Sequence, residues 1–480
     1  EWLAFDVACF MYGLVSIPFY PSWKPSEISA ILEQVDMKCL IAETPSLTSE
    51  ISIINGRIVY LAASDDRLTS LDSFSPVDDL IIQKVDETDL VTIVFTSGTE
   101  GRPKGVPQTH KNHFTNLAQV SEVGLFEEND LVYLFLPLSH SFGRLCGYVG
   151  SVLGVPTLFP SLCGEGTRID LRKVVSLIAV ANPTIVPAVP KFFELIKKEI
   201  ESRIKPVKRF LSFSNFLNKA THSVLGKFII PRIFGKSIRY CISGGAKLMR
   251  ETQLFFDSLG LLILEGYGLT ETCVATHVNL PWARRLGSVG RPLPGIQHKI
   301  VDGEVLLKGE NIFNGYWRST EQPFTDDGWF KTGDSGWIDA DNFLFIEGRK
   351  KEILVLSNGK NVPCLKLEHI LESLVEAKHV VVFGDGADFV VAVLFVDDPN
   401  FLFPRMHSFL EQLNQNLNPY EKVKGVLLVK GDLTVDNGFL TPTLKLRRQL
   451  IYKVLESELM KLFEKPNQIV ISNLSGHFFK

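Results

Sequence analysis

The sequence predicts an α/β protein with a large, layered N-terminal domain and a smaller C-terminal domain. Segments that resemble strands and helices alternate through the first ~350 residues, which favours helices layered on a sheet. The composition changes at 348–352, and shorter elements follow over about 130 residues, enough for an independent domain. The length of 480 residues agrees, since one domain typically takes roughly 150.

The apolar pattern predicts the elements in order. The chain opens inside a helix containing Trp2, Phe5 and Met11, and because no methionine precedes it, we expect the true N-terminus and any targeting signal to lie upstream. A second helix is predicted over 26–35, with Ser26 as its N-cap. The other predicted elements are strands 39–42, 91–95 and 182–189, helix 191–200, helix 367–376, strands 379–383 and 390–395, and helix 447–463.

The composition excludes several classes of protein. A net charge of −4 argues against nucleic acid as the main partner. Seven cysteines without regular spacing argue against a zinc site and a disulfide framework, and fit a reducing, cytoplasmic location. No uncharged apolar run reaches about 18 residues, so no transmembrane helix is expected. The apolar stretch 145–160 is interrupted by glycine and proline and is expected in the core.

A basic stretch stands apart from the rest of the chain. Residues 202–250 contain eleven Lys or Arg and no Asp or Glu, with five phenylalanines among them. One interpretation is a helical insertion with a solvated basic face. The alternative is a peripheral contact with anionic lipid headgroups through 203–239.

The motif TSGTEGRPKG, residues 96–105, directly follows the predicted strand 91–95. Glycines let backbone N–H groups approach phosphate oxygens, and the hydroxyls and Lys104 add donors and charge. We therefore expect a polyphosphate-binding loop of the βα type. It is not a Walker A loop, because Pro103 stands at the second glycine position and Gly105 follows the lysine.

Further motifs follow in order: LPLSHSFG (136–143), SGGAKL (243–248), EGYGLTET (265–272), DGWFKTGDSG (327–336), GRKKE (348–352) and NGFLTPTLKLRR (437–448). With them the whole chain resembles the adenylate-forming (AMP-binding) superfamily. VPKFFE and LTPTLKLRR are most similar to long-chain fatty acyl-CoA synthetases.

The resemblance implies a fold and a division of the chain. It implies an N-terminal AMP-binding domain over 1–348, a hinge at 349–351 and a small, mobile C-terminal α+β lid domain over 352–480. Lys351 would be the hinge pivot.

The resemblance also implies residue roles. Tyr267 would stack on adenine, Asp334 would accept hydrogen bonds from the ribose, and His140 and Gly266 would flank the acyl pocket. The catalytic residues would be Lys104, Thr270, Glu271 and Lys445, and the magnesium ligands Thr99 and Glu271. The implied nucleotide-binding residues are Thr96, Ser97, Gly98, Thr99, Gly101, Gly244, Gly245, Ala246, Tyr267, Asp334, Ile346 and Arg349.

The implied reaction uses ATP, Mg²⁺ and coenzyme A. A fatty acid becomes an acyl adenylate with release of pyrophosphate, and the acyl group then passes to the coenzyme A thiol. Two alternatives stay open: an acyl carrier protein as the acceptor, and a homologue that binds nucleotide or lipid without catalysis. The hinge motif leaves the acceptor open, because eukaryotic long-chain enzymes tend to have DRKKD where this chain has GRKKE.

Overall fold

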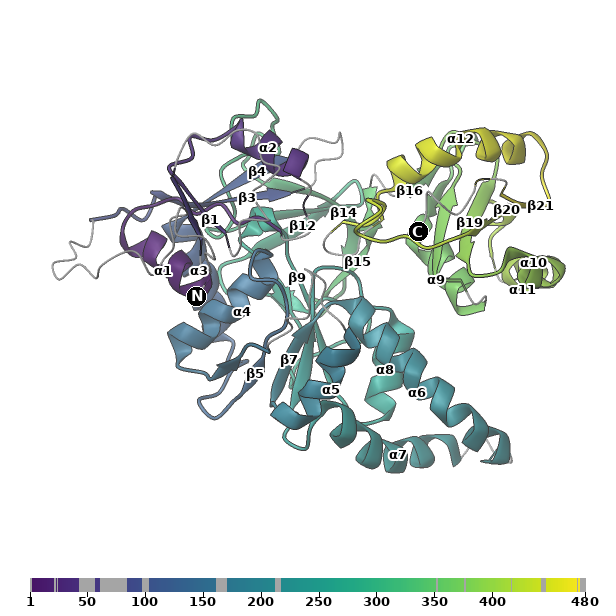
Figure 1. The fold of residues 1–480 in the computed structure, drawn as a ribbon, viewed down its shortest axis with the longest axis horizontal. Coiled ribbons are helices and arrows are strands. Elements are labelled where there is room, and N and C mark those ends of the chain that lie inside the picture. Colours follow the sequence, from purple (N-terminus) through teal and green to yellow (C-terminus); the bar gives the residue numbers. More distant parts are fainter. Residues whose placement is uncertain are drawn as a thin grey trace. The chain divides into compact units, whose positions relative to one another are not determined.

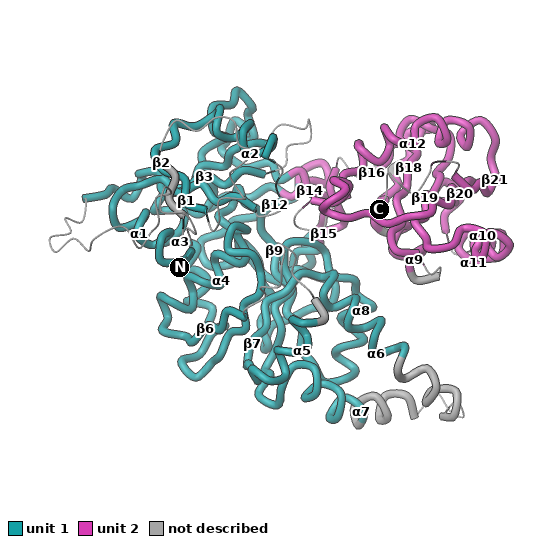
Figure 2. Tube along the Cα trace, viewed as in Figure 1, with its two compact units in different colours: residues 1–300, 306–332, 338–345 teal, residues 301–305, 333–337, 346–480 magenta. Residues whose placement is uncertain are grey.

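The computed structural model describes residues 2–20, 23, 25–42, 57–60, 84–96, 103–160, 171–211, 217–350, 353–374, 377–415, 417–441, 446–472 and 474. For 57–60, 171–172, 203–211, 217–224, 353, 361, 366 and 373–374 it describes the backbone alone. The chain divides into two compact units, shown in Figure 2. Unit 1 comprises 1–300, 306–332 and 338–345, and unit 2 comprises 301–305, 333–337 and 346–480.

Unit 1 alternates helices and strands, as Figure 1 shows. Its helices are α1 (Trp2–Met11), α2 (Pro25–Leu32), α3 (His110–Glu122), α4 (Ser141–Leu153), α5 (Leu171–Ala181), α6 (Pro190–Leu211), α7 (Leu217–Phe234), α8 (Arg250–Ser258) and the 3₁₀ turn η3 (Thr270–Thr272). Its strands are β1 (Cys39–Ala42), β2 (Arg57–Tyr60), β3 (Leu90–Thr96), β4 (Lys104–Thr109), β5 (Val132–Tyr133), β6 (Thr157–Leu158), β7 (Ile185–Ala188), β8 (Tyr240–Ser243), β9 (Ile263–Tyr267), β10 (His277–Val278) and β11 (Arg291–Pro292).

A seven-stranded sheet of order β11-β10-β9-β8-β7-β5-β6 forms the centre of unit 1. Strands β6, β5, β7, β8 and β9 run parallel, and β10 and β11 add antiparallel pairs. Every residue of β7 and β8 is buried, as expected for parallel strands covered on both faces. Apolar side chains of α5, α6, α7 and α8 join those of the strands in one core cluster. This core supports the turns that follow β8 and β9.

A four-stranded sheet of order β12-β13-β14-β15 contains residues of both units. Its strands are β12 (Gln297–Val301), β13 (Glu304–Lys308), β14 (Phe330–Ile338) and β15 (Leu344–Arg349).

The rest of unit 2 combines the two-stranded sheet β16-β17 with a four-stranded sheet of order β18-β19-β20-β21, which has helices on both faces. It contains β16 (Ile353–Val355), β17 (Asn361–Pro363), α9 (Cys364–Leu374), β18 (His379–Phe383), β19 (Val390–Val396), α10 (Pro399–Leu402), the 3₁₀ turn η5 (Phe403–Arg405), α11 (Met406–Gln415), β20 (Val423–Lys430), α12 (Arg448–Glu464) and β21 (Gln468–Ile471). Alternate residues of β18, β19 and β20 point to opposite faces, so Val393 packs with α12 while Leu394 packs with α9 and α11. The mixed architecture agrees with the predicted fold class.

Most predicted elements are confirmed. Strand β7 is shorter than the predicted 182–189, and helix α6 is longer than the predicted 191–200. Helix α2 requires two further corrections. Helix α2 begins at Pro25, so Ser26 lies inside the helix and is not its N-cap. Proline is favoured at a first helical position because it has no N–H to leave unpaired. The same helix ends at Leu32 rather than at 35. In the stretch 145–160, Leu145 and Val149 are buried as expected, but Val152 and Phe159 are exposed.

Candidate functional site

The glycine-rich motif connects two strands. β3 and β4 form an antiparallel hairpin in which Thr96 is opposite Lys104. Ser97, Gly98, Thr99 and Gly101 lie outside the described residues. The expectation of a βα-type loop was wrong, because 104–109 pairs with β3 before any helix begins. Helix α3 starts only after Thr109, whose hydroxyl accepts from the backbone N–H of Asn112 in a capping box.

The EGYGLTET motif forms a tight turn between β9 and β10. A Cβ on Gly268 would lie 1.4 Å from the carbonyl oxygen of Val274, so only glycine fits there. Cys273 and Val274 both have positive φ angles, 50° and 106°. Such a backbone is rare for a β-branched residue and persists only where neighbouring groups enforce it. The turn therefore holds Thr270 and Glu271 in a tightly constrained backbone.

Three buried amide side chains form hydrogen bonds to the backbone of this turn. Gln108 Nε2 donates to the carbonyl of Thr270 (2.8 Å), and Asn311 Nδ2 donates to that of Thr272 (2.8 Å). Asn116 donates to the carbonyl of Ala275 (2.6 Å) and accepts from its N–H (3.1 Å). Sequence reasoning missed all three, because the contacts join positions 39 to 162 residues apart.

The segment Phe313–Trp317 joins the turn to the hairpin. The Phe313 N–H donates to the carbonyl of Glu271 (2.9 Å), and the Trp317 N–H donates to that of Gly105 (2.8 Å). Between them, the Tyr316 hydroxyl donates to Glu271 Oε1 (3.0 Å), and Lys104 Nζ lies 5.2 Å from the centre of the Tyr316 ring. Lys104 is also paired with the carboxylate of Glu321. The structure thus gathers Lys104 and Glu271 around one tyrosine that the motifs did not indicate.

The SGGAKL motif follows β8 directly. Gly244 is buried, and a Cβ there would lie 3.2 Å from the Phe142 ring, whereas Gly245 and Ala246 are exposed. Tyr267 ends the neighbouring parallel strand β9, with its ring 6.0 Å from that of His277. Since the ends of parallel strands meet at one edge of a sheet, these two segments lie side by side. A Cβ on Gly266 would lie 3.3 Å from the carbonyl of His277.

Glu265, one residue before Gly266, is buried in β9. Its carboxylate accepts from the N–H of Leu248 (2.8 Å) and from Nε2 of Gln253 (2.8 Å). Burial raises the pKa of Glu265 to about 8, although these donors act in the opposite direction. This carboxylate ties the segment after β8 to β9.

His140 is the N-cap of α4. Its Nδ1 accepts from the N–H of Phe142 at 3.2 Å, which satisfies one of the free donors of the first turn. This is the local role that a histidine at a helix start can play. Its place beside an acyl pocket stays a prediction.

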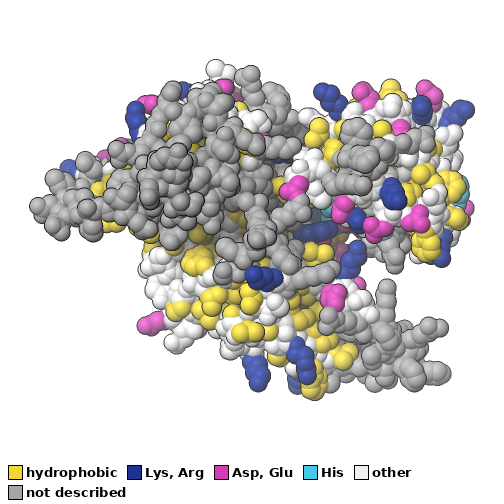
Figure 3. All heavy atoms as spheres, in the orientation of Figure 1, with side chains coloured by type: hydrophobic (Ala, Val, Ile, Leu, Met, Phe, Trp, Pro, Cys, Tyr) yellow, Lys and Arg dark blue, Asp and Glu magenta, His cyan; other side chains and the backbone are white. Residues whose placement is uncertain are grey.

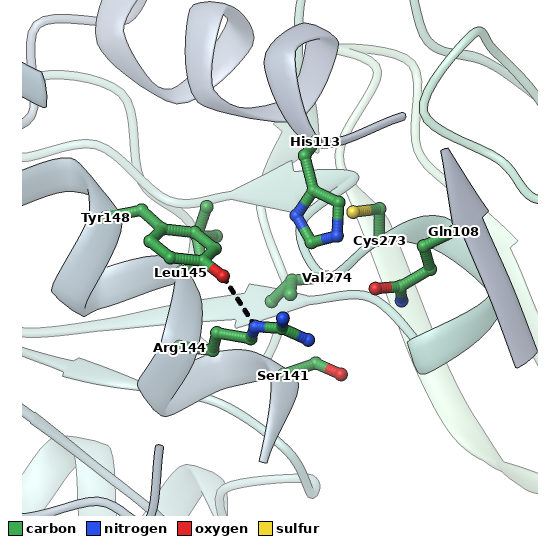
Figure 4. Close-up of a pocket in the computed structure, with 8 residues that line it drawn as sticks. All are labelled: Gln108, His113, Ser141, Arg144, Leu145, Tyr148, Cys273 and Val274. Atoms are coloured by element: carbon green, nitrogen blue, oxygen red, sulfur yellow. Dashed lines mark hydrogen bonds between the residues drawn. The ribbon is translucent and has the colours of Figure 1, made fainter. Parts of the chain in front are cut away.

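A small cavity lies behind the turn, as Figure 4 shows. Arg144 Nη1, His113 Nε2 and Ser141 Oγ are buried around it with no hydrogen-bond partner among the described residues. Its volume of about 10 Å³ is close to that of one water. Arg144 is itself held by buried Asp6 of α1 (Nε to Oδ2, 2.7 Å), so it is a structural anchor rather than a free cation.

Unit 2 contains a second group of predicted residues. Asp334 is buried on β14, and its Oδ1 lies 2.9 Å from Nε of Arg349 at the end of β15. Ile346 is buried on β15. The neighbouring Glu304 accepts from the Gly333 N–H (2.9 Å) and pairs with Lys350 (2.9 Å). Lys351 and Lys445 lie outside the described residues.

The described residues offer no cluster of three or more His, Cys, Asp or Glu side chains that could hold a metal ion. The half-buried carboxylate of Glu271 nevertheless fits Mg²⁺, which commonly takes one or two protein carboxylates and completes its shell with phosphate oxygens and water.

Within the described part of the chain, no helix is long and apolar enough to cross a membrane.

Comparison with known proteins adds a family match. A family model described as AMP-binding enzyme matches residues 1–317. A long-chain-fatty-acid–CoA ligase of Mycobacterium bovis is 29% identical, covering 97% of this chain and 86% of its own. Long-chain-fatty-acid–CoA ligase 5 of Mus musculus is 26% identical, covering 97% and 78%.

Solved structures share the fold. ATP-bound MatB from Rhodopseudomonas palustris matches with a TM-score of 0.73 at 22% identity, covering 95% of this chain and 87% of its own.

Proposed function

The chain belongs to the AMP-binding enzyme family, and we propose that it is a ligase that activates a long-chain fatty acid with ATP and passes the acyl group to coenzyme A. The observation that carries this proposal is the similarity to long-chain-fatty-acid–CoA ligases across 97% of the chain.

The proposed reaction has two balanced steps. A carboxylate oxygen of the acid attacks the α-phosphorus of ATP, an oxygen–phosphorus bond forms, and pyrophosphate leaves. The thiol sulfur of coenzyme A then attacks the acyl carbon, a thioester forms, AMP leaves, and the thiol proton passes to solvent. The first step needs no general base, because carboxyl groups titrate near ~4 and the acid is already ionised. It needs positioning and neutralisation of charge.

The residues gathered in unit 1 suit those needs. Lys104 would bind the β- and γ-phosphates, Thr270 would bond the α-phosphate, and Tyr267 would stack on adenine. Glu271 would hold Mg²⁺ together with Thr99, and the ion, when bound, supplies positive charge to the phosphate oxygens. The hydrogen bonds of Gln108 and Asn311 to the turn hold Thr270 and Glu271 in place before ATP arrives.

The predicted residues of unit 2 would serve the ribose and the second step. Asp334 would accept from the ribose hydroxyls, and its pairing with Arg349 orients its carboxylate. Lys445 would neutralise the acid and the α-phosphate during adenylation, and a rotation about Lys351 would withdraw it. The limits 1–348, 349–351 and 352–480 are part of this proposal.

A panel of carboxylic acids tests the proposed substrate. The purified protein is given ATP, Mg²⁺ and acetate, octanoate, palmitate or an amino acid, and pyrophosphate release is measured. Palmitate should give the fastest release, and a preference for acetate or an amino acid would contradict the proposal. Coenzyme A and acyl carrier protein, offered as rival acceptors, identify the thiol. No release with any acid would favour a binding protein without catalysis.

We also propose that α7 and the residues just after it make a peripheral contact with anionic lipid. Lys227, Phe228, Arg232 and Lys236 are exposed there, and Phe228 exposes 58% of its surface. Figure 3 shows hydrophobic and basic side chains together at the lower edge of the view, in the region of α5 and α7. Adjacent apolar and cationic groups suit the interface between headgroups and acyl chains.

Sedimentation with vesicles tests this contact. The triple variant Lys227→Glu, Arg232→Glu, Lys236→Glu should pellet less with phosphatidylserine vesicles than the wild type. The triple variant Lys38→Glu, Lys308→Glu, Lys331→Glu makes the same change of charge on exposed lysines elsewhere and should pellet normally. Equal pelleting of both variants would refute the contact.

A further inference from the structure

Tyr316 lies between the two charged side chains of the candidate site in unit 1. Its hydroxyl donates to Glu271 Oε1 at 3.0 Å, and its ring lies 5.2 Å below the ammonium of Lys104. It therefore has a hydrogen bond to one of them and a cation–π contact with the other.

The backbone on either side of Tyr316 is anchored. The Phe313 N–H bonds the carbonyl of Glu271 and the Trp317 N–H bonds that of Gly105, so the segment is tied to the turn and to the hairpin at once. The Tyr316 ring also packs edge-on against the buried ring of Phe313, with centroids 4.9 Å apart. A side chain fixed at its base and along its ring presents its hydroxyl in one direction.

The hydroxyl restricts Glu271 to one orientation. Within the described part of the chain, Tyr316 is the only donor to this carboxylate, which bonds it through Oε1 alone. A bond to one oxygen leaves the other able to bind a cation. Groups that orient a metal-binding side chain in this way commonly govern its affinity for the metal.

We infer that Tyr316 is a positioning residue that orients the Glu271 carboxylate for the Mg²⁺ of bound ATP. The inference rests on the proposed function and adds to it a residue outside the motifs. Lys104 and its predicted phosphate contacts do not depend on the hydroxyl, because the ring alone makes the contact with the ammonium.

The variant Tyr316→Phe separates the two contacts. It removes the hydroxyl bonded to Glu271 and keeps the ring beneath Lys104. The matched control is Tyr452→Phe, which removes a hydroxyl from a partly exposed tyrosine on α12. Melting temperature verifies that each variant is folded.

The test is the Kd of ATP measured by calorimetry on the full chain, at a series of Mg²⁺ concentrations and once with EDTA and no divalent metal. In the wild type, Mg²⁺ should tighten ATP binding. In Tyr316→Phe, the Mg²⁺ concentration for half-maximal tightening should rise about tenfold, since groups that orient a metal ligand are typically worth 10- to 100-fold in metal affinity. The Kd without metal should be unchanged, and Tyr452→Phe should match the wild type in both.

Three outcomes would overturn the inference. An unchanged Mg²⁺ requirement in Tyr316→Phe would show that Glu271 needs no positioning by the hydroxyl. An equal loss of affinity with and without metal would assign the hydroxyl to a phosphate instead. Absence of any Mg²⁺-dependent ATP binding in the wild type would remove the proposed function and this inference together, which distinguishes it from the first two.

Discussion

The ammonium of Lys104 pairs with the carboxylate of Glu321, 217 positions further along the chain. Both side chains are partly exposed, 32% and 45%, so solvent screens the pair. In the proposed reaction, Lys104 binds phosphate oxygens. A carboxylate therefore pairs with the lysine that the proposal assigns to ATP, and the two anions would compete for it.

Glu321→Gln should tighten ATP binding by removing this competitor. We expect the Kd of ATP to fall roughly two- to fivefold, because exposed ion pairs are worth about 0.2–1 kcal/mol. The gain should shrink as salt is added. Titration calorimetry measures it, and Glu310→Gln, which breaks another exposed pair with Lys111, is the control. A weaker affinity in Glu321→Gln would show that the carboxylate assists the nucleotide rather than competing with it.

Gly268→Ala should disrupt the turn that carries Thr270 and Glu271. The new methyl would lie 1.4 Å from the Val274 carbonyl oxygen, so the backbone must shift. We expect ATP binding to be lost and stability to fall by about 1–3 kcal/mol, as for other overpacked sites. Chemical denaturation and calorimetry measure both effects.

Gly147→Ala serves as the control for this substitution. That glycine lies inside α4, and its nearest neighbour would be 3.5 Å from the added methyl. Removing a glycine from a helix interior should leave stability equal or slightly higher. If Gly268→Ala behaves like this control, the tight turn is not required.

Asp6→Ala should strongly destabilise unit 1. Asp6 and Arg144 are both buried, and Arg144 also bonds Ser16 Oγ and Thr92 Oγ1 at 2.8 Å each. Removing the carboxylate leaves a buried guanidinium unpaired, which typically costs about 3–5 kcal/mol. The double variant Asp6→Ala, Arg144→Met should recover part of the loss in denaturant titrations. A double variant less stable than Asp6→Ala would mean that the unpaired charge of Arg144 is not the main cause of the loss.

Glu265 should make stability depend on pH. Its pKa is about 8 in the folded chain against 4.5 for an unperturbed group, so the unfolded state loses its proton first as the pH rises. The stability from this group is fully present below pH ~4.5 and is lost as the pH rises through about 8. Chemical denaturation gives the free energy of unfolding at each pH. Between about pH 5 and 9, this free energy should fall by at least about 1 kcal/mol more in the wild type than in Glu265→Gln.

The test compares how steeply the stability of each protein changes with pH. It therefore does not depend on how well glutamine packs in the buried site of Glu265. Glu251→Gln changes an exposed acid on α8 and should keep the wild-type slope. If Glu265→Gln also keeps it, the buried carboxylate does not titrate in this range.

The sequence by itself determined the α/β class, the type of each predicted element and the limits of several of them. Strand β18 occupies the predicted residues, β19 extends one residue beyond its prediction, and α12 is shifted by one residue at both ends. These features follow from local pattern. A run of apolar residues, or apolar residues spaced as on one face of a helix, can be recognised within about ten positions. The glycine-rich motif predicts a phosphate loop, since its glycines and hydroxyls are adjacent in the chain.

Only the tertiary structure decided what surrounds the motif residues. The strand before the motif is followed by a second strand and not by a helix, because residues 104–109 pair with β3. Tyr316 reaches Glu271 across 45 positions, and Gln108 reaches Thr270 across 162. No spacing in the sequence encodes such contacts, because they exist only once the chain has folded. Burial is also decided by the tertiary structure. The pKa of the Glu265 carboxyl is raised because the folded chain buries it, which its identity as a glutamate does not predict.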